Sequence, residues 1–229
     1  MGNENEFLKL RREILDDEFG YLNKEQRAGV FNCDAPLLIL AGAGSGKTTV
    51  VVSKIGYLMK YGNSYFSNRV PENLEKDDIV FLKKALKDKS LRKGERFYSL
   101  MADSPVKPYN ILAITFTNKA AGEMRERIES RYGIDTKTLW AQTFHSTCVK
   151  ILRAFISKIG YESSFSIYDD SDSVKLLDGI IKKLNLSEKY NAKIAASFIS
   201  KAKCAYQTPE EFEKDFNDPI FSYMPKIYK

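Results

Sequence analysis

The sequence predicts an α/β protein in which helices flank a parallel sheet, with an all-helical subdomain at its C-terminal end. Three apolar, strand-like runs at 36–41, 110–116 and 138–142 each precede a stretch of helical periodicity. This alternation is typical of a parallel α/β layer. From Asp169 onward only the helical period recurs. The glycine-rich turn between the first strand and its helix indicates which kind of α/β protein this is.

The residues before the first strand are predicted to be helical. The polar stretch 1–20 predicts a helix or arm, and a second helix is expected to begin within 22–28. Asn23 is its expected N-cap, because a short amide side chain can accept a bond from a free N–H of the first turn.

The turn after the first strand has the composition of a phosphate-binding loop. Its glycines lack a Cβ, so the backbone can adopt positive φ and direct successive N–H groups at an anion, as can the first turn of the helix that follows. Lys47 can reach the β- and γ-phosphates, and the Thr48 hydroxyl can ligate Mg²⁺. The residues expected to contact a nucleoside triphosphate are Ala41, Gly42, Ala43, Gly44, Ser45, Gly46, Lys47, Thr48 and Thr49. The alternative, a structural glycine turn followed by a chance Lys-Thr, is disfavoured by the strand and helix on either side.

Composition and charge limit the number of domains, the partners and the cellular compartment that we expect. The 229 residues, 43% of them hydrophobic, suffice for one or two domains, and the net charge of +6 is compatible with a polyanionic partner without requiring one. No apolar run approaches the roughly 20 residues needed to span a bilayer, and the charged N-terminus is unlike a signal peptide. We therefore expect a cytoplasmic protein with no membrane partner. The cysteines Cys33, Cys148 and Cys204 are too dispersed to suggest a disulfide framework or a zinc site.

Two regions depart from the alternation of strands and helices. The segment 62–109 is far longer than the usual αβ connection, so it must hold structure of its own or be mobile. The spacing of Ile79, Leu82 and Leu86 predicts one helix around 72–88. Its basic second half is interpreted as a solvated helix face, with contact to nucleic acid as the alternative. In the helical tail, Thr208 begins a capping-box pattern with Glu211.

Several segments together resemble the UvrD/Rep/PcrA group of superfamily-one DNA helicases. In chain order these are Leu22 and Asn23 with Gln26 (Q motif), 41–49 (first helicase motif), 114–121 with Met124 (motif Ia), 143–146 (motif Ib), and 165–167 with Asp169 (entry to the helical subdomain). Alanine at the position of Ala41 is common in that family. Thr49 departs from the arginine that many members carry there, which leaves one nucleotide contact without its usual residue.

The resemblance implies a fold and an activity. Residues 1–160 would form part of a RecA-like motor domain with an insertion at 62–109, and 161–229 would form part of a helical subdomain. The parent protein would be an ATP-dependent DNA helicase that binds ATP and Mg²⁺, translocates 3′ to 5′ on single-stranded DNA and unwinds duplex DNA in replication or repair. The sequence makes no prediction of oligomeric state.

The resemblance also assigns roles to individual residues. Gln26 would recognise the adenine edge, and Phe116 would offer its ring face to an unpaired base. Thr115, Asn118, Thr143 and His145 would lie along the single strand. The alternatives are a core aromatic at a strand end for Phe116 and a helix-start hydrogen bond for His145.

The family's Asp-Glu motif, which holds Mg²⁺ at the end of an apolar strand, has no match in this sequence. The acidic strings 16–18 and 169–170 are better interpreted as a helix and a helix cap. We therefore expect an N-terminal fragment that lacks the Walker B carboxylate and the second motor domain, and that hydrolyses ATP poorly alone. Two other interpretations stay open: the motor of a recombination nuclease–helicase, and a non-helicase nucleotide switch or kinase built on the same loop.

Overall fold

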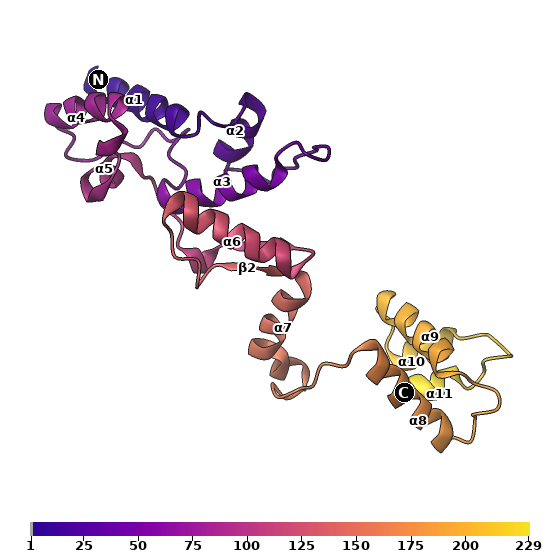
Figure 1. The fold of residues 1–229 in the computed structure, drawn as a ribbon. Helices are drawn as coiled ribbons and strands as arrows, with labels where there is room; N and C mark the ends of the chain where they lie inside the picture. Colours follow the sequence, from indigo (N-terminus) through magenta and orange to yellow (C-terminus); the bar gives the residue numbers. More distant parts are fainter. Residues whose placement is uncertain (1) are drawn as a thin grey trace. The chain divides into compact units, whose positions relative to one another are not determined.

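The computed structural model describes residues 2–229, which form two units, the first ending at Phe155 and the second running from Ile156 to Lys229. Figure 1 shows the order of the elements along the chain. Each unit has its own cluster of buried apolar side chains. Within residues 2–229 no helix combines the length and apolarity needed to cross a bilayer.

The first unit begins with three helices, α1 (Gly2–Glu18), α2 (Lys24–Phe31) and α3 (Lys47–Lys60). The predicted N-terminal helix is confirmed as α1, which buries Phe7, Ile14 and Leu15 on one face. The predicted start of α2 is confirmed as well, because the Asn23 side chain accepts a 2.8 Å bond from the backbone N–H of Gln26.

The sheet has two parallel strands, β1 (Leu112–Thr115) and β2 (Trp140–Thr143). They are connected by α6 (Asn118–Tyr132), and α7 (Phe144–Phe155) follows β2 directly. The Arg125 side chain donates to the backbone carbonyl of Ala141, which joins α6 to β2. The register pairs Thr115 with Thr143, so both strands end at the same edge of the sheet.

The prediction of a strand at 36–41 is wrong for this structure. The segment is extended but pairs with no other strand among the described residues, and Leu38 and Leu40 are 80% and 86% exposed. A strand needs a neighbour to pair its backbone N–H and C=O groups, and β1 pairs only with β2. Nor is β1 covered on both faces as expected, since Leu112 and Ile114 are exposed.

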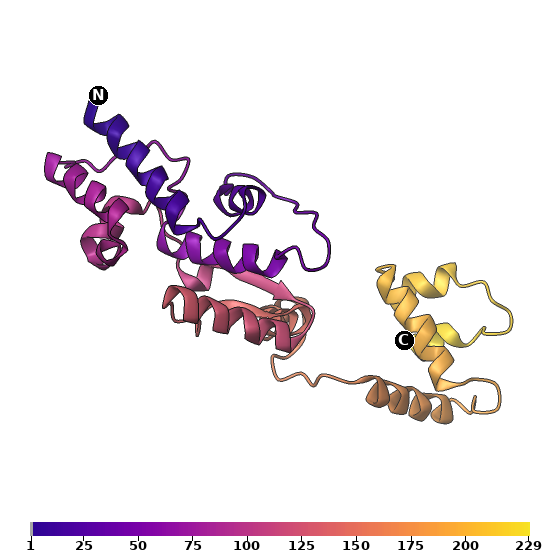
Figure 2. The same ribbon diagram turned by 45° about the horizontal axis from the view of Figure 1, so that its top comes forward.

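The long segment 62–109 has structure of its own. It holds α4 (Lys76–Lys87), α5 (Gly94–Met101) and two short 3₁₀ turns, Lys89–Leu91 and Pro108–Asn110. The predicted helix is confirmed as α4, which buries Ile79 and Leu82 and lies along α1 in both views (Figures 1 and 2).

Basic side chains of this segment meet acidic residues inside the first unit. Lys83 pairs with Glu6 at 2.6 Å, and Lys89 and Arg92 both reach Asp17 at 3.0 and 2.6 Å. Most of the basic run is thus ion-paired within the protein. The paired lysines still expose 53% (Lys83) and 65% (Lys89) of their side chains, so this face is solvated as predicted, with part of its charge balanced within the protein.

The second unit is helical throughout its regular structure. Its elements are a 3₁₀ turn (Ile156–Ile159), α8 (Asp170–Lys183), α9 (Ala192–Cys204), α10 (Pro209–Asp215) and α11 (Met224–Tyr228). Asp169 caps α8, and Thr208 forms the predicted capping box with Glu211. Leu177 and Ile181 of α8 pack with Ala195 of α9 in its core.

Candidate functional site

The glycine-rich loop leads directly into α3. Gly44 and Gly46 adopt left-handed φ values of +76° and +84°, which a residue with a side chain rarely tolerates. The Ser45 hydroxyl donates to the carbonyl of Gly42 over 2.8 Å and closes the turn. Gly46 is the N-cap of α3 and has no side chain that could accept a hydrogen bond. No capping side chain therefore occupies the first backbone N–H groups of the helix. Backbone donors and the positive end of the helix dipole thus meet at one exposed turn.

Lys47, the first residue of α3, folds back across this turn. Its Nζ donates to the carbonyl oxygens of Ala41 and Gly42 over 3.0 and 2.6 Å. The side chain is exposed, and carbonyl oxygens are neutral acceptors that an anionic oxygen can replace. The ammonium group is therefore held at the mouth of the loop, where it can turn toward an anion.

Gln26 contacts the loop from α2. Its Nε2 donates to the carbonyl of Ser45 over 3.0 Å, while its Oε1 accepts from the backbone N–H of Asn23 over 3.1 Å. A Cβ added at Gly46 would lie 2.7 Å from this Nε2, so the close approach depends on a glycine. The side chain predicted to recognise the nucleotide base thus lies beside the loop.

Thr48 and Thr49 follow Lys47 in the first turn of α3. Thr48 is exposed and Thr49 half-buried, and Thr49 lies beside Arg127 and Arg131 of α6 in a small pocket. The exposed Thr48 hydroxyl is an oxygen ligand of the kind Mg²⁺ accepts. No cluster of three or more acidic, histidine or cysteine side chains that could hold a metal occurs between residues 2 and 229. Among the described residues, Thr48 is therefore the candidate ligand of Mg²⁺ at this loop.

A second group of candidate residues lies where β1 and β2 end. Phe116 follows β1 and precedes Thr117, the N-cap of α6, and its side chain is fully exposed at 102%. Thr115 bonds the carbonyl of Thr117 over 3.0 Å, and Asn118 begins α6 on the exposed side. The alternative that Phe116 is a core aromatic is excluded in this structure.

The end of β2 carries the remaining candidates. The Thr143 hydroxyl is buried and exchanges a 2.8 Å bond with the hydroxyl of Ser146, while accepting from the Ser146 backbone N–H. Its hydroxyl is thus occupied by the first turn of α7. His145 is exposed, with its ring edge-on to the exposed ring of Phe144. Sequence reasoning did not single out Phe144, although it lies between two of the predicted contact residues.

The structure thus gathers the candidates into two groups within the first unit. Gln26 and residues 41–49 form a loop rich in backbone donors, and Phe116, Asn118 and His145 lie together at the strand ends because Thr115 and Thr143 are paired. The first group suits a phosphate-bearing ligand. The second offers exposed aromatic faces and polar groups at one edge of the sheet.

Comparison with known proteins identifies relatives of this chain. The family model described as the UvrD/REP helicase N-terminal domain matches residues 22–69 and 94–229. The ATP-dependent DNA helicase PcrA of Bacillus subtilis (strain 168) is 39% identical over 217 residues, which is 91% of this chain and 24% of the relative. Proteins of the same name from Staphylococcus epidermidis and Staphylococcus aureus are each 35% identical over 209 residues, 91% of this chain and 23% of theirs. The chain thus spans about a quarter of the length of these curated relatives.

Proposed function

The chain belongs to the UvrD/REP helicase N-terminal domain family, and from that premise we propose that it is the ATP-binding and DNA-contacting N-terminal part of a DNA helicase. The observation that carries the proposal is the loop that precedes α3. Two left-handed glycines, an uncapped helix start and Lys47 converge there on one exposed turn, which is the arrangement that binds phosphates.

In this proposal the loop holds the triphosphate and Gln26 holds the base. Backbone N–H groups of 44–48 bind the phosphate oxygens, and Lys47 leaves the carbonyls of Ala41 and Gly42 to reach the β- and γ-phosphates. The Gln26 amide, with one donor and one acceptor, matches the adjacent acceptor and donor of adenine. Thr48 ligates Mg²⁺, which neutralises phosphate charge during hydrolysis.

The DNA-contacting residues lie at the ends of β1 and β2. Phe116 stacks on an unpaired base, and Thr115, Asn118 and His145 lie along the single strand. Thr143 contributes through its backbone and its cap of α7, because its hydroxyl is occupied by Ser146. Translocation 3′ to 5′, unwinding of duplex DNA, a RecA-like motor domain and a second motor domain belong to the same proposal.

The exposed segment 36–41 is part of this proposal too. Leu38 and Leu40 face solvent although their pattern is that of a buried parallel strand. In a longer protein, neighbouring strands cover them and complete the sheet beside the phosphate-binding loop.

Two titrations of the 229-residue chain test the proposal: a fluorescent ATP analogue and a labelled oligothymidine. Lys47→Ala is expected to weaken nucleotide binding at least about tenfold, because the ammonium contacts two phosphates. Lys60→Ala, at the other end of α3, is the matched control. Nucleotide binding that ignores Lys47→Ala would contradict the proposal. Nucleotide binding without any DNA binding would favour a nucleotide switch.

A further inference from the structure

The segments outside the family match meet in space. Residues 1–21 and 70–93 are not covered by the family model, yet α1 and α4, which they contain, pack together and are tied by ion pairs such as Lys83 to Glu6. These two segments, which the family model does not match, therefore form one packed layer of this chain.

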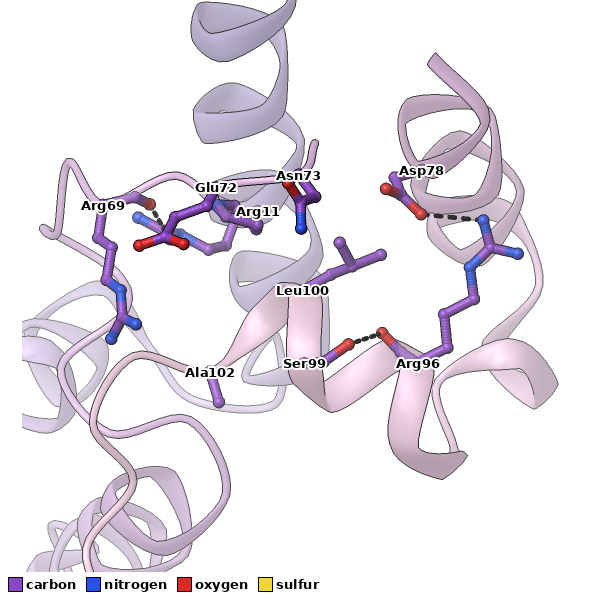
Figure 3. A pocket seen from close by; sticks show the side chains of 10 residues that line it. Arg11, Arg69, Glu72, Asn73, Asp78, Arg96, Ser99, Leu100 and Ala102 are labelled. Atoms are coloured by element: carbon purple, nitrogen blue, oxygen red, sulfur yellow. Dashed lines mark hydrogen bonds and ion pairs between the residues drawn. The ribbon is translucent and has the colours of Figure 1, made fainter. Parts of the chain in front are cut away.

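A pocket of 490 Å³ opens where this layer meets α5 (Figure 3). Its polar walls come from α1 (Arg11), the stretch before α4 (Arg69, Glu72, Asn73), α4 (Asp78) and α5 (Arg96). A pocket of this size suits a small molecule. None of the residues assigned to nucleotide or DNA lines it, so the pocket lies outside the proposed function.

Two of the three arginines in the pocket are already ion-paired. Arg69 meets Asp103 at 3.2 Å, and Arg96 meets Asp78 at 2.9 Å. Their charges are therefore largely balanced within the protein.

Arg11 differs from the other two. Its side chain is only 2% exposed, and it donates to the backbone carbonyls of Arg69, over 2.8 Å, and Ser67. Its Nε has no hydrogen-bond partner. The charge of Asp103 acts on Arg11 and favours its charged form, but the ion pair of Asp103 is made with Arg69. Burial lowers the pKa of Arg11, yet a guanidinium keeps its proton. A buried, charged donor with an unpaired N–H and a counter-charge shared with Arg69 is costly unless a further anion balances it.

Glu72 is the only other unbalanced charge among these polar residues. It is exposed and lines the pocket together with Arg11 and Arg69 (Figure 3), and no ion pair of Glu72 occurs among residues 2–229. Its negative charge at the entrance opposes an incoming anion.

We propose that this pocket binds a small molecule through a phosphate or carboxylate group, with Arg11 as the buried anchor and Glu72 as a charge that weakens the interaction. Asn73 and Arg96 also line the pocket and supply further donors. The occupied pocket places a negative charge beside the Arg11 guanidinium at the junction of α1, α4 and α5.

The test is an NMR titration of the 229-residue chain that follows the arginine Nε–H signals. Inorganic phosphate and acetate are added in separate arms, which distinguishes the two oxyanion sources. The chain carries Lys47→Ala, so phosphate held at the glycine-rich loop does not contribute. Failure of the loop to bind nucleotide would therefore leave this result unaffected.

We expect a saturable shift of the Arg11 Nε–H signal with at least one oxyanion. Arg11→Gln should weaken binding at least about tenfold, and Glu72→Gln should tighten it about threefold or more at low salt. Arg12→Gln, on the adjacent and exposed position of α1, should leave it unchanged. If Arg11→Gln does not fold, the affinity of Glu72→Gln for the oxyanion tests the proposal instead. If Arg11 had only a structural role, Glu72→Gln would leave that affinity unchanged. Absence of a saturable shift, or binding that Glu72→Gln leaves unchanged or weakens, would overturn the proposal.

Discussion

The side-chain amide nitrogen of Gln26 lies 3.0 Å from the carbonyl oxygen of Ser45, so one glutamine joins the first turn of α2 to the glycine-rich loop. The same side chain accepts from the N–H of Asn23 and completes the capping box of α2. Gln26 therefore has a structural role at its oxygen and a loop contact at its nitrogen. The two can be separated experimentally.

Gln26→Glu keeps the acceptor for Asn23 and removes the donor to Ser45. We expect the free energy of unfolding to change by less than about 0.5 kcal/mol, while affinity for a fluorescent ATP analogue falls about tenfold. Gln26→Ala should show the same loss of affinity and also destabilise the chain by about 1 kcal/mol, because the cap is lost. Unchanged nucleotide affinity in both variants would contradict the assigned role.

Gly56 is required where α3 packs on α6. A Cβ there would lie 2.3 Å from the ring of Tyr132, whose hydroxyl also bonds Tyr21 over 2.9 Å. Gly56→Ala should destabilise the first unit by about 2 kcal/mol, because the ring must move within a packed core. Gly122→Ala is the matched control, since a Cβ there meets nothing within 4 Å. It should stabilise α6 by about 0.5–1 kcal/mol.

Urea unfolding followed by the fluorescence of Trp140 measures this difference. Trp140 is the chain's single tryptophan and lies in β2, so its signal reports the first unit. Equal stability of the two alanine variants would show that α3 and α6 do not pack as described.

Phe116 should matter for DNA and not for stability. Its ring is fully exposed, so Phe116→Ala should leave the unfolding midpoint unchanged. Loss of one stacked base should weaken binding of a labelled oligothymidine about tenfold, measured by fluorescence anisotropy. Tyr109→Ala, which removes another exposed aromatic near the opposite end of β1, should change affinity less than about twofold. Equal losses in both variants would mean that aromatic exposure, rather than the strand-end site, determines DNA binding.

Asp17 should give the first unit a pH-dependent contribution to stability. A hydrogen bond from Lys89, followed by one from Arg92, lowers the pKa of Asp17 below its ordinary value of 3.8. A carboxyl group with a lowered folded-state pKa stabilises the fold above its unfolded pKa, and this contribution is lost as pH falls through the folded pKa. The carboxylate is partly exposed, so solvent screening limits the contribution to about 1 kcal/mol.

Asp17→Asn tests this expectation in urea unfolding at two pH values. The variant should be less stable than the parent near about pH 7, and the difference should shrink below about pH 4 as Asp17 is protonated in the parent. Glu13→Gln removes only an exposed 3.7 Å pair with Lys9 and should cost less than about 0.5 kcal/mol. A difference that grows on acidification would contradict the assigned pairing.

Features governed by local chemistry could be predicted from the sequence. Asn23, Asp169 and Thr208 all cap helices as expected, because a cap depends on a side chain and the N–H groups two or three residues away. The α4 helix followed from its apolar spacing. The nucleotide and DNA roles of individual site residues remain predictions.

Features that depend on distant partners were not predictable. The apolar run 36–41 has the pattern of a strand, but pairing needs a neighbour that local pattern cannot supply. The docking of α1 on α4 and the burial of Arg11 join residues more than fifty positions apart, as in the Arg11 bond to Arg69. No local periodicity predicts such contacts, so the pocket at Arg11 became visible only in three dimensions.

We propose that Lys47 belongs to the ATP site of a DNA-driven motor. The most direct measurement is ATP hydrolysis with and without single-stranded DNA, in a longer protein that contains this chain. We expect stimulation by DNA in the parent and loss of at least about 99% of that rate in Lys47→Ala, because the phosphate-binding ammonium is removed. DNA-stimulated hydrolysis that survives Lys47→Ala would contradict it.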